Sequence, residues 1–286
     1  MKPINSPFLA IAIAAAAVAP HAVAAVSIPQ APVITYGLVR DEFGSPLTSA
    51  SAAALALVRD AAPGGTVYAK TSVGATAFPG MNYRLSLEID SAGPSRSYAV
   101  LEGTPMRIRC TLDGADASLT PTPVFATPKN GTAQRLDFSL GEDADGDGMP
   151  DAWEAWVLRC AGQAADAAAI AAFRADGDAD GDGMSNYREY LAGTDPFLAT
   201  DLLAITAFAR DEETGRLAVT FTTVPDRKYR LVTTVGLENP VWAPVATARE
   251  KGAAAVYETY DGTGRLITVY VDAPDEVKSF FRVAGN

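Results

Sequence analysis

Histidine is almost absent from this sequence of 286 residues, whose one histidine is His21. His21 falls in the amino-terminal stretch that we interpret below as a signal peptide. The remainder of the chain therefore cannot form a Ser-His-Asp or Cys-His catalytic group, and it lacks the imidazole ligands of the usual zinc sites. These two kinds of chemistry are excluded.

Cysteine is scarce, with only Cys110 and Cys160. An even number of cysteines in an exported protein allows one disulfide. Each cysteine also sits on an apolar face, Cys110 in an alternating strand pattern and Cys160 at helical spacing, which is typical of a buried free thiol. The sequence leaves both interpretations open.

Long hydrophobic runs are missing as well. The apolar, alanine-rich run from Phe8 to Val18 is shorter than the roughly 20 residues that a membrane-spanning helix needs. It follows Lys2 and precedes Ala22-Val23-Ala24, an arrangement typical of a cleaved signal peptide. We expect a signal peptide over residues 1–24, cleavage after Ala24, and a mature chain that is secreted or held at the cell surface with no membrane span.

Negative charge is concentrated in one segment. Residues 141–201 hold 14 acids and 3 bases, whereas residues 25–140 hold 9 of each and residues 202–286 hold 11 acids and 10 bases. Such a segment repels itself unless it binds a cation. A disordered linker would also be acidic, but the aromatic residues of this segment and an internal repeat argue against that alternative.

The repeat is the phrase DADGDGM, which occurs at 143–149 and at 178–184. A calcium loop of twelve residues takes oxygen ligands from positions 1, 3, 5, 7, 9 and 12 and turns at a glycine in position 6. Gly148 and Gly183 occupy position 6. The first loop then offers Asp143, Asp145, Asp147, the carbonyl of Met149, Asp151 and Glu154, and the second offers Asp178, Asp180, Asp182, the carbonyl of Met184, Asn186 and Glu189. The sequence predicts two calcium ions.

On these motifs the segment 143–196 resembles the EF-hand, dockerin-like and thrombospondin type 3-like calcium repeats of secreted bacterial proteins. The resemblance implies calcium-ligand roles for the twelve residues named above. It departs from an EF-hand at position 8, where Pro150 and Ser185 replace the usual branched apolar residue. Since proline has no N–H to donate, the short β-link between paired EF-hand loops is not expected.

Helical and strand patterns complete the architecture. Helices are predicted over 151–160, 164–175 and 186–193, the last ending at Gly193. Residues 33–140 and 202–286 each contain seven short alternating segments separated by turns, which predicts two β-sandwiches. The fold class is therefore mainly β with a small α-helical insert, in domains 25–140, 141–201 and 202–286. Within the first, GLVRDEFGSPL at 37–47 resembles the first hairpin of carboxypeptidase-regulatory-like (prealbumin-like) modules.

Three smaller features have two interpretations each. Asn130-Gly131-Thr132 fits a glycosylation site, but Asn-Gly also favours a hairpin turn, which we prefer. The aromatic residues Trp242, Tyr257 and Tyr260 could stack on sugar rings or belong to the core, which is more common. The basic group Arg227, Lys228 and Arg230 is predicted to be a solvated strand end, because three charges make a poor nucleic-acid surface.

The function expected from these features is a secreted, non-enzymatic, calcium-binding modular protein. Calcium would fold and rigidify the joint between the two sandwiches, in extracellular or cell-surface binding or assembly. The alternative is a carbohydrate-binding or dockerin-like accessory component of a polysaccharide-degrading system. A hydrolase that uses two carboxylates is a third and weaker hypothesis.

Overall fold

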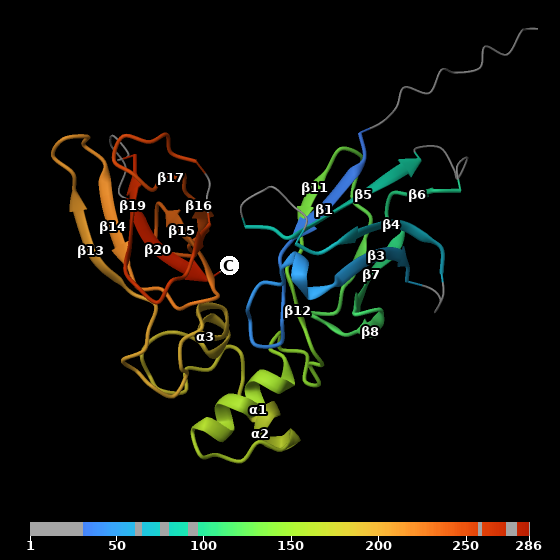
Figure 1. Cartoon of the computed structure of the whole chain (residues 1–286), viewed down its shortest axis with the longest axis horizontal. Coiled ribbons are helices and arrows are strands. Elements are labelled where there is room, and N and C mark those ends of the chain that lie inside the picture. Colours follow the sequence, from blue (N-terminus) through green and yellow to red (C-terminus); the bar gives the residue numbers. More distant parts are fainter. Residues whose placement is uncertain are drawn as a thin grey trace, which may run out of the picture.

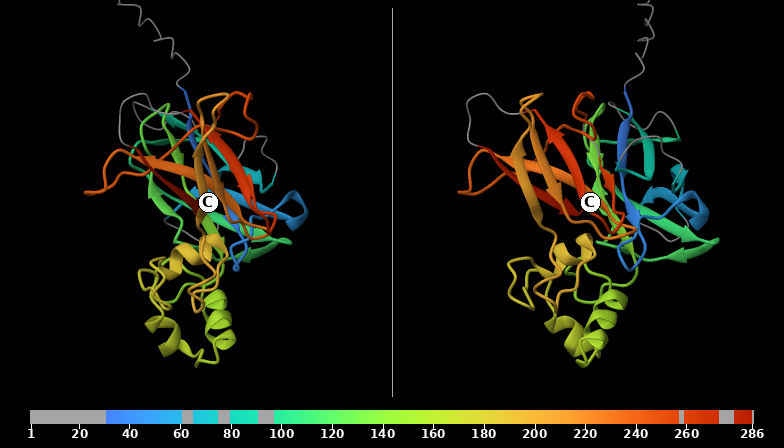
Figure 2. Two further views of the ribbon diagram at one scale, coloured as in Figure 1. Left: turned by 90° about the vertical axis from the view of Figure 1, so that its left-hand side faces the viewer. Right: turned by 60° about the vertical axis from the view of Figure 1, so that its left-hand side comes forward.

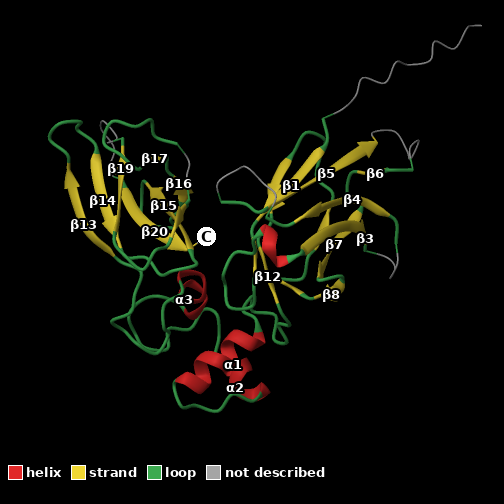
Figure 3. Cartoon of the chain, viewed as in Figure 1, coloured by secondary structure: helices red, strands yellow, loops and turns green. Residues whose placement is uncertain are grey.

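The computed structural model of the chain describes residues 31–60, 65–74, 80–90, 97–256, 259–272 and 279–285. Strands make up 39% of it and helices 11%, and the helices lie in a small region around 151–192. The predicted fold class, mainly β with a small helical insert, is confirmed (Figures 1 and 3). The predicted signal peptide and Tyr257 lie outside the described residues.

The first twelve strands form three sheets within residues 33–140. The strands are β1 (Val33–Gly37), β2 (Val39–Arg40), β3 (Ala53–Arg59), β4 (Val67–Ser72), β5 (Tyr83–Asp90), β6 (Ala99–Leu101), β7 (Pro105–Leu112), β8 (Ala115–Ala117), β9 (Leu119–Thr120), β10 (Val124–Ala126), β11 (Ala133–Arg135) and β12 (Phe138–Leu140). The sheet orders are β11-β1-β5-β6, β10-β7-β3-β4 with β8 beside β7, and β2-β12-β9. We call these strands the N-terminal module.

Side-chain alternation explains how the N-terminal module is held together. In β5, Leu85 and Leu87 point inward while the residues between them are more exposed, and Leu55 and Leu57 do the same in β3. Alternate residues of a strand face opposite sides of a sheet. These four leucines belong to one buried cluster, so the two larger sheets pack face to face as a sandwich.

The strand count differs from the seven that were predicted for this module. The alternating segment 33–39 divides into two strands at Leu38, whose N–H bonds to Asp137 Oδ1 over 2.9 Å, and its second part, β2, pairs with β12 instead of β5. The short connection after β7 contains β8. Short strands of two or three residues are too brief to show a period, which is why the pattern missed them.

The Asn130-Gly131 dipeptide forms a tight turn, as preferred. Gly131 has a φ of +72°, and the N–H of Thr132 bonds to the carbonyl of Lys129 over 3.1 Å. The turn does not make a hairpin, because β10 before it pairs with β7 whereas β11 after it runs parallel to β1.

The segment after β2 folds back as a tight loop. Asp41 Oδ1 accepts hydrogen bonds from the N–H groups of Phe43 (3.0 Å) and Ser45 (2.8 Å). Gly44 takes a φ of +88°, which favours glycine. We call residues 41–46 the junction loop, because the other two parts of the chain contact it.

The last eight strands form two sheets, which we call the C-terminal module. The strands are β13 (Ile205–Arg210), β14 (Leu217–Phe221), β15 (Lys228–Thr234), β16 (Ala243–Pro244), β17 (Thr247–Ala248), β18 (Tyr260–Asp261), β19 (Ile267–Val271) and β20 (Phe280–Gly285). Their orders are β13-β14-β19-β17 and β16-β15-β18, with β20 paired to β15. Phe221 and Leu231 from different sheets share one buried cluster, so this module also has a two-layered core.

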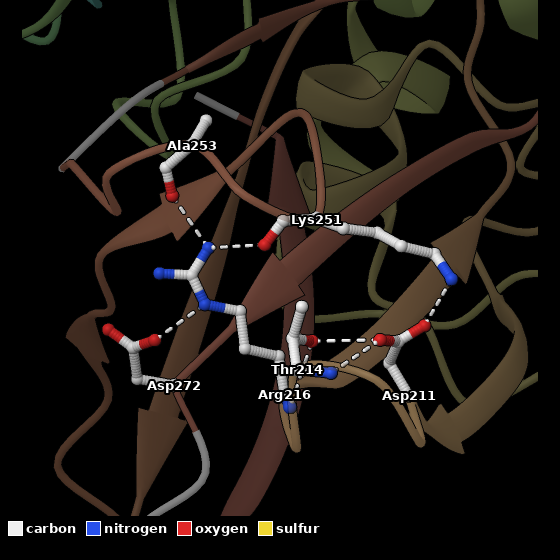
Figure 4. Close-up of polar contacts among 6 residues, drawn as sticks. All are labelled: Asp211, Thr214, Arg216, Lys251, Ala253 and Asp272. Atoms are coloured by element: carbon white, nitrogen blue, oxygen red, sulfur yellow. Dashed lines mark hydrogen bonds and ion pairs between the residues drawn. The ribbon is translucent and has the colours of Figure 1, made fainter.

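A polar network fixes the loops at one end of the C-terminal module (Figure 4). Arg216 binds Asp272 through Nε at 2.8 Å, and its Nη1 donates to the carbonyls of Lys251 and Ala253. Lys251 in turn forms an ion pair with Asp211. Together these contacts tie the loop around residue 251 to the end of the sheet where β13 ends, β14 begins and β19 ends.

The chain between the two modules contains the helices α1 (Asp151–Cys160), α2 (Ala167–Ala172) and α3 (Asn186–Ala192). The first has the predicted bounds, and the third ends at Gly193, in a left-handed conformation with φ +79°. The second is shorter than the predicted 164–175, because the chain leaves helical geometry at Phe173, which packs near Trp153 at a ring-centroid distance of 6.1 Å. Met149, Val157 and Tyr190 complete this small core.

The two cysteines are free thiols, Cys110 buried and Cys160 exposed. The disulfide that the sequence allowed is therefore not formed. The alternative of two buried thiols is correct for Cys110 and wrong for Cys160, which is exposed. Burial raises the pKa of Cys110 to about 11.

One preferred interpretation is confirmed and one expectation is wrong. Tyr260 is fully buried and its hydroxyl bonds to Thr247, so it belongs to the core, as preferred, and offers no surface to a sugar ring. Arg227 is not a solvated strand end: its guanidinium donates to Ser45 Oγ at 2.9 Å and to the carbonyl of Phe43, both in the junction loop. The C-terminal module thus contacts the N-terminal module directly.

The helical segment contacts both modules (Figure 2). The hydroxyl of Tyr190 in α3 donates to Ser139 Oγ in β12 at 2.7 Å, and the hydroxyl of Tyr229 in β15 donates to the carbonyl of Ala192 at 2.7 Å. On the other side, the rings of Trp156 in α1 and Phe43 in the junction loop meet edge to face at 6.1 Å. The segment lies beneath both sandwiches in Figure 1 and connects them at one end, and we call residues 141–201 the helical wedge.

Candidate calcium loops

Each copy of the DADGDGM phrase folds into a compact acidic loop. The carboxylate oxygens of Asp143, Asp145 and Asp147 lie within 4.8 Å of one another, and those of Asp178, Asp180 and Asp182 do the same. Three like charges at this separation repel each other strongly outside bulk water. The structure thus brings together the residues predicted for positions 1, 3 and 5 of both loops.

The backbone of each loop turns around its first aspartate. Asp143 accepts hydrogen bonds from the N–H groups of Gly146 (2.7 Å) and Gly148 (3.0 Å). Asp178 accepts the equivalent bonds from Gly181 (2.8 Å) and Gly183 (2.9 Å).

Glycine is required at position 6 of each loop. Gly148 and Gly183 have φ values of +97° and +95°, in the left-handed region that glycine enters without steric cost. The two loops therefore repeat one geometry.

The residue at position 12 of each loop is a fully buried glutamate. Glu154 in α1 and Glu189 in α3 are both 0% exposed. An ionised carboxylate is almost never buried without a partner, because its desolvation costs several kcal/mol. Yet both oxygens of Glu154 and Oε2 of Glu189 accept no hydrogen bond, and the same holds for Oδ2 of Asp180 and of Asp182.

These unpartnered oxygens test whether the loops fit a calcium ion. They belong to predicted ligands, they converge on two small regions, and they are acceptors with no donor. Hard oxygen donors of this kind are the ligands that calcium prefers. Asp143, Asp145, Asp147 and Glu154 would hold one ion, and Asp178, Asp180, Asp182 and Glu189 the other.

The electrostatics of the unliganded loops agree with this interpretation. Burial, followed by repulsion from Asp147 and Asp145, raises the pKa of Glu154 to about 9. Burial and then Asp180 raise the pKa of Glu189 to about 8, against a hydrogen bond from Thr194 that lowers it. The ionised form of both carboxyl groups is thus disfavoured unless a cation neutralises the loop.

The residues at position 9 make hydrogen bonds that were not predicted. Asp151 Oδ1 accepts the N–H of Ala144 at 2.9 Å, and Asn186 Oδ1 accepts the N–H of Ala179 at 3.2 Å. The Asn186 amide also donates to the carbonyl of Arg174 at 2.8 Å. Both side chains close their loop onto its own second residue, so direct ligation by them stays a prediction, as does ligation by the carbonyls of Met149 and Met184.

Two hydrogen bonds to the predicted ligands were not foreseen from the sequence. The N–H of Ala175 donates to Asp147 Oδ2 at 2.7 Å, which joins the approach to the second loop to the first. Thr194 donates to Glu189 Oε1 at 3.2 Å. Neither contact has a sequence signal within the twelve-residue template, because both partners lie outside it. The β-link of paired EF-hands is absent from residues 141–201, all of which are described, in agreement with the departure at Pro150.

Comparison with known families identifies the second loop. The model of the bacterial TSP3 repeat matches residues 178–199, so the chain contains a repeat of calcium-binding type there. No curated protein matches the chain. Among the described residues, no helix is both long and apolar enough to cross a membrane.

Proposed function

We propose that this chain is a secreted, non-enzymatic modular protein in which two calcium ions, one in each loop, fold the helical wedge and thereby fix the N-terminal module against the C-terminal module. The observation that carries the proposal is the pair of buried glutamates, Glu154 and Glu189, whose side-chain oxygens lack partners. Calcium supplies positive charge and accepts six to eight oxygen ligands in a flexible geometry.

The connection from loop to modules is short. Glu189 is followed directly by Tyr190, which bonds to Ser139 of the N-terminal module, and two residues after Tyr190 the carbonyl of Ala192 accepts a hydrogen bond from the hydroxyl of Tyr229 in the C-terminal module. A helix whose first turn is held at Glu189 therefore presents both contacts in a fixed orientation.

The first loop acts on the other side of the wedge. Glu154 lies in the first turn of α1 between Trp153, which packs 5.0 Å from Tyr190, and the turn that carries Trp156 to Phe43. Ordering this turn would assemble the small aromatic core and present Trp156 to the junction loop.

Calcium titration calorimetry on the mature chain, with thermal unfolding in calcium and in chelator, tests the proposal. We expect two sites per chain and a higher melting temperature in calcium, because a ligand that binds the folded state stabilises it by about 2.7 kcal/mol per site at a hundredfold excess over Kd. Magnesium is the control, since it demands a tighter octahedral geometry. No heat of binding and identical melting curves would refute the calcium function.

The position of the modules needs its own measurement. Small-angle scattering in calcium should give a compact particle, and in chelator a larger radius of gyration, if the wedge orders the two sandwiches. Equal radii with normal calcium binding would leave the ions as local stabilisers and contradict the role in fixing the modules.

A further inference from the structure

A cavity of about 380 Å³ lies where α3 and the second acidic loop meet the C-terminal module. Arg188 of α3, Arg230 of β15 and Arg282 of β20 line it together with the apolar side chains of Leu191 and Val283. In Figure 1, α3 lies directly beneath the carboxyl end of β20. Three arginines around one cavity are unexpected in a chain with a net charge of −11.

None of these arginines forms an ion pair within the described residues, although Asp137 lies close enough to Arg230 to raise its pKa. Elsewhere in the C-terminal module, Arg216 pairs with Asp272 and Lys228 with Asp261. No described carboxylate pairs with Arg188, Arg230 or Arg282. Moreover, Nε of Arg230 is buried and has no acceptor, which is unfavourable for a charged donor.

The surroundings of the cavity increase this imbalance. Burial and then the nearby charge of Arg135 lower the pKa of Arg230, against Asp137, which raises it, while burial and then Arg188 lower the pKa of Arg282. Arg282 has one favourable contact, the ring of Trp242 at 4.5 Å. A guanidinium remains charged at every physiological pH, so these groups present a positive surface that attracts an anion.

The remaining wall restricts what kind of anion would fit. Leu191, Leu203, Val283 and the side chain of Met184 line the cavity beside the arginines. Arginine binds carboxylate, sulfate and phosphate oxygens through two parallel N–H groups. An apolar wall adds affinity only for a ligand that has apolar surface to bury. The cavity therefore suits a ligand that combines an oxyanion with a compact apolar or ring-shaped body.

We propose that this cavity is a binding site for an organic oxyanion, a carboxylate or a sulfate ester on a compact ring, held by Arg188, Arg230 and Arg282. The ring lies against Leu191 and Val283, and the oxyanion accepts hydrogen bonds from the guanidinium groups. Acidic sugars and aromatic acids both have this chemistry.

One wall of the site comes from the proposed calcium joint. Gly183 of the second loop and Tyr187, Arg188 and Leu191 of α3 face the cavity, so this part of the inference rests on the proposed function. If calcium orders α3, the site is complete only in the calcium-bound chain, and an anion should bind more weakly after calcium is removed.

Titration of the full mature chain in saturating calcium, followed by calorimetry, tests the site. The probes are benzoate and glucuronate, with benzamide and glucose as their uncharged counterparts and inorganic phosphate as an anion without a ring. We expect saturable binding of at least one of the two ring-bearing anions and at least tenfold weaker binding of its uncharged counterpart and of phosphate. Which anion binds more tightly separates an aromatic acid from an acidic sugar.

Three variants locate the binding. Arg188→Gln should weaken the anion about tenfold or more, because a hydrogen bond to a charged group contributes about 1.5–3 kcal/mol, and since Arg188 is exposed the variant should fold. Arg230→Gln should do the same, with circular dichroism to check folding. Arg265→Gln, an exposed arginine of the same module outside the cavity, is the matched control and should bind normally.

The outcomes are distinguishable. No anion binding by a chain that binds calcium normally overturns this site and leaves the proposed function intact. Equal binding of benzamide and benzoate, equal binding of phosphate, or unchanged binding by Arg188→Gln also overturns it. Anion binding that is unaffected by chelator overturns only its dependence on the calcium joint.

Discussion

The hydroxyl of Tyr190 donates a hydrogen bond to Ser139 Oγ over 2.7 Å, in a fully buried position. Tyr190 is the next residue after Glu189, the last predicted ligand of the second loop, and Ser139 lies in β12 of the N-terminal module. One peptide unit therefore separates the calcium loop from the contact that attaches it to the first sandwich. The same hydroxyl lies 3.4 Å from the carbonyl of Asp41 in the junction loop.

A double-mutant cycle on Tyr190→Phe and Ser139→Ala should show this contact. Each single change is expected to lower the free energy of unfolding by about 1 kcal/mol in calcium, and the two should couple, because a neutral hydrogen bond contributes about 0.5–1.5 kcal/mol. Urea unfolding measures both. Tyr187→Phe is the control on the same helix, where no hydrogen bond of the hydroxyl is described, and should change little. Additive effects of the two substitutions would show that the hydroxyls are not coupled.

Neutral replacement of the buried glutamates should have opposite effects with and without calcium. Glu154→Gln and Glu189→Gln each remove one bidentate ligand, so each should abolish or weaken one site and lose up to about 2.7 kcal/mol of calcium stabilisation at a hundredfold excess over the wild-type Kd. In chelator the same variants should be at least as stable as the parent chain, because an uncharged amide replaces a buried carboxyl that has no donor in Glu154 and only Thr194 as a donor in Glu189. Melting curves in both conditions, with calorimetry, measure this.

The matched control for that experiment is Glu212→Gln, an exposed glutamate in the turn between β13 and β14. It changes the net charge equally and should leave both melting curves unchanged. A fall in chelator stability for Glu154→Gln as large as the fall in calcium would mean that the glutamate has a structural partner and is no ion ligand.

The calcium-free chain should lose stability as pH rises from about 5 to about 9, the reverse of ordinary acid denaturation. The pKa values of Glu154 and Glu189 are raised to about 9 and about 8 in the folded chain, whereas an unfolded glutamate titrates near about 4.3. The folded state therefore binds more protons than the unfolded state throughout this window, and the linkage slope is negative.

Calcium should remove that trend, because bound ligands are ionised and release their protons to the solvent. Urea unfolding at several pH values, in calcium and in chelator, tests both halves of the prediction. The Glu154→Gln, Glu189→Gln double variant should have a flat profile in chelator across the same window. A chelator profile that rises with pH in the parent chain would contradict the raised pKa values.

The acidic loops were the most predictable part of the molecule, because their geometry is local. Asp143 and Gly148 are five residues apart, and the bond between them follows from the turn that glycine permits. The bounds of α1 and the end of α3 at Gly193 were predicted for the same reason. The loop-closing hydrogen bonds of Asp151 and Asn186 were not predicted, since a ligand and a loop-closing acceptor have the same sequence signature.

The contacts that join the N-terminal module, the helical segment and the C-terminal module could not be predicted from the sequence. Arg227 and Phe43 are 184 residues apart, and nothing in either local pattern indicates that the guanidinium donates to that carbonyl. The cavity arginines illustrate the same limit: Arg188 and Arg282 lie on a helix and a strand that meet only after folding. Tertiary packing, and not residue spacing, decides which isolated charges become neighbours.

Gly193 matters both for the end of α3 and for the contact between the modules, because at this residue a Cβ atom would disturb both. It ends α3 with φ +79°, and its N–H bonds to the carbonyl of Glu189 at 2.6 Å. A Cβ at this residue would lie 2.8 Å from Arg227 Nε and 2.9 Å from Arg227 Cγ. Gly193→Ala must therefore strain the backbone and also displace the side chain that contacts Phe43 and Ser45.

We expect Gly193→Ala to lower the free energy of unfolding by about 1 kcal/mol from the left-handed backbone alone, with a further loss from the displaced arginine. Since the end of α3 is bonded to Glu189, the affinity of the second calcium site should fall while that of the first is unchanged. Gly236→Ala is the control, because that glycine has no left-handed φ and its Cβ would meet no neighbouring atom within 4 Å. Equal stability of the two variants would show that Arg227 and the end of α3 accommodate a methyl group freely, and that the junction is looser than its contacts imply.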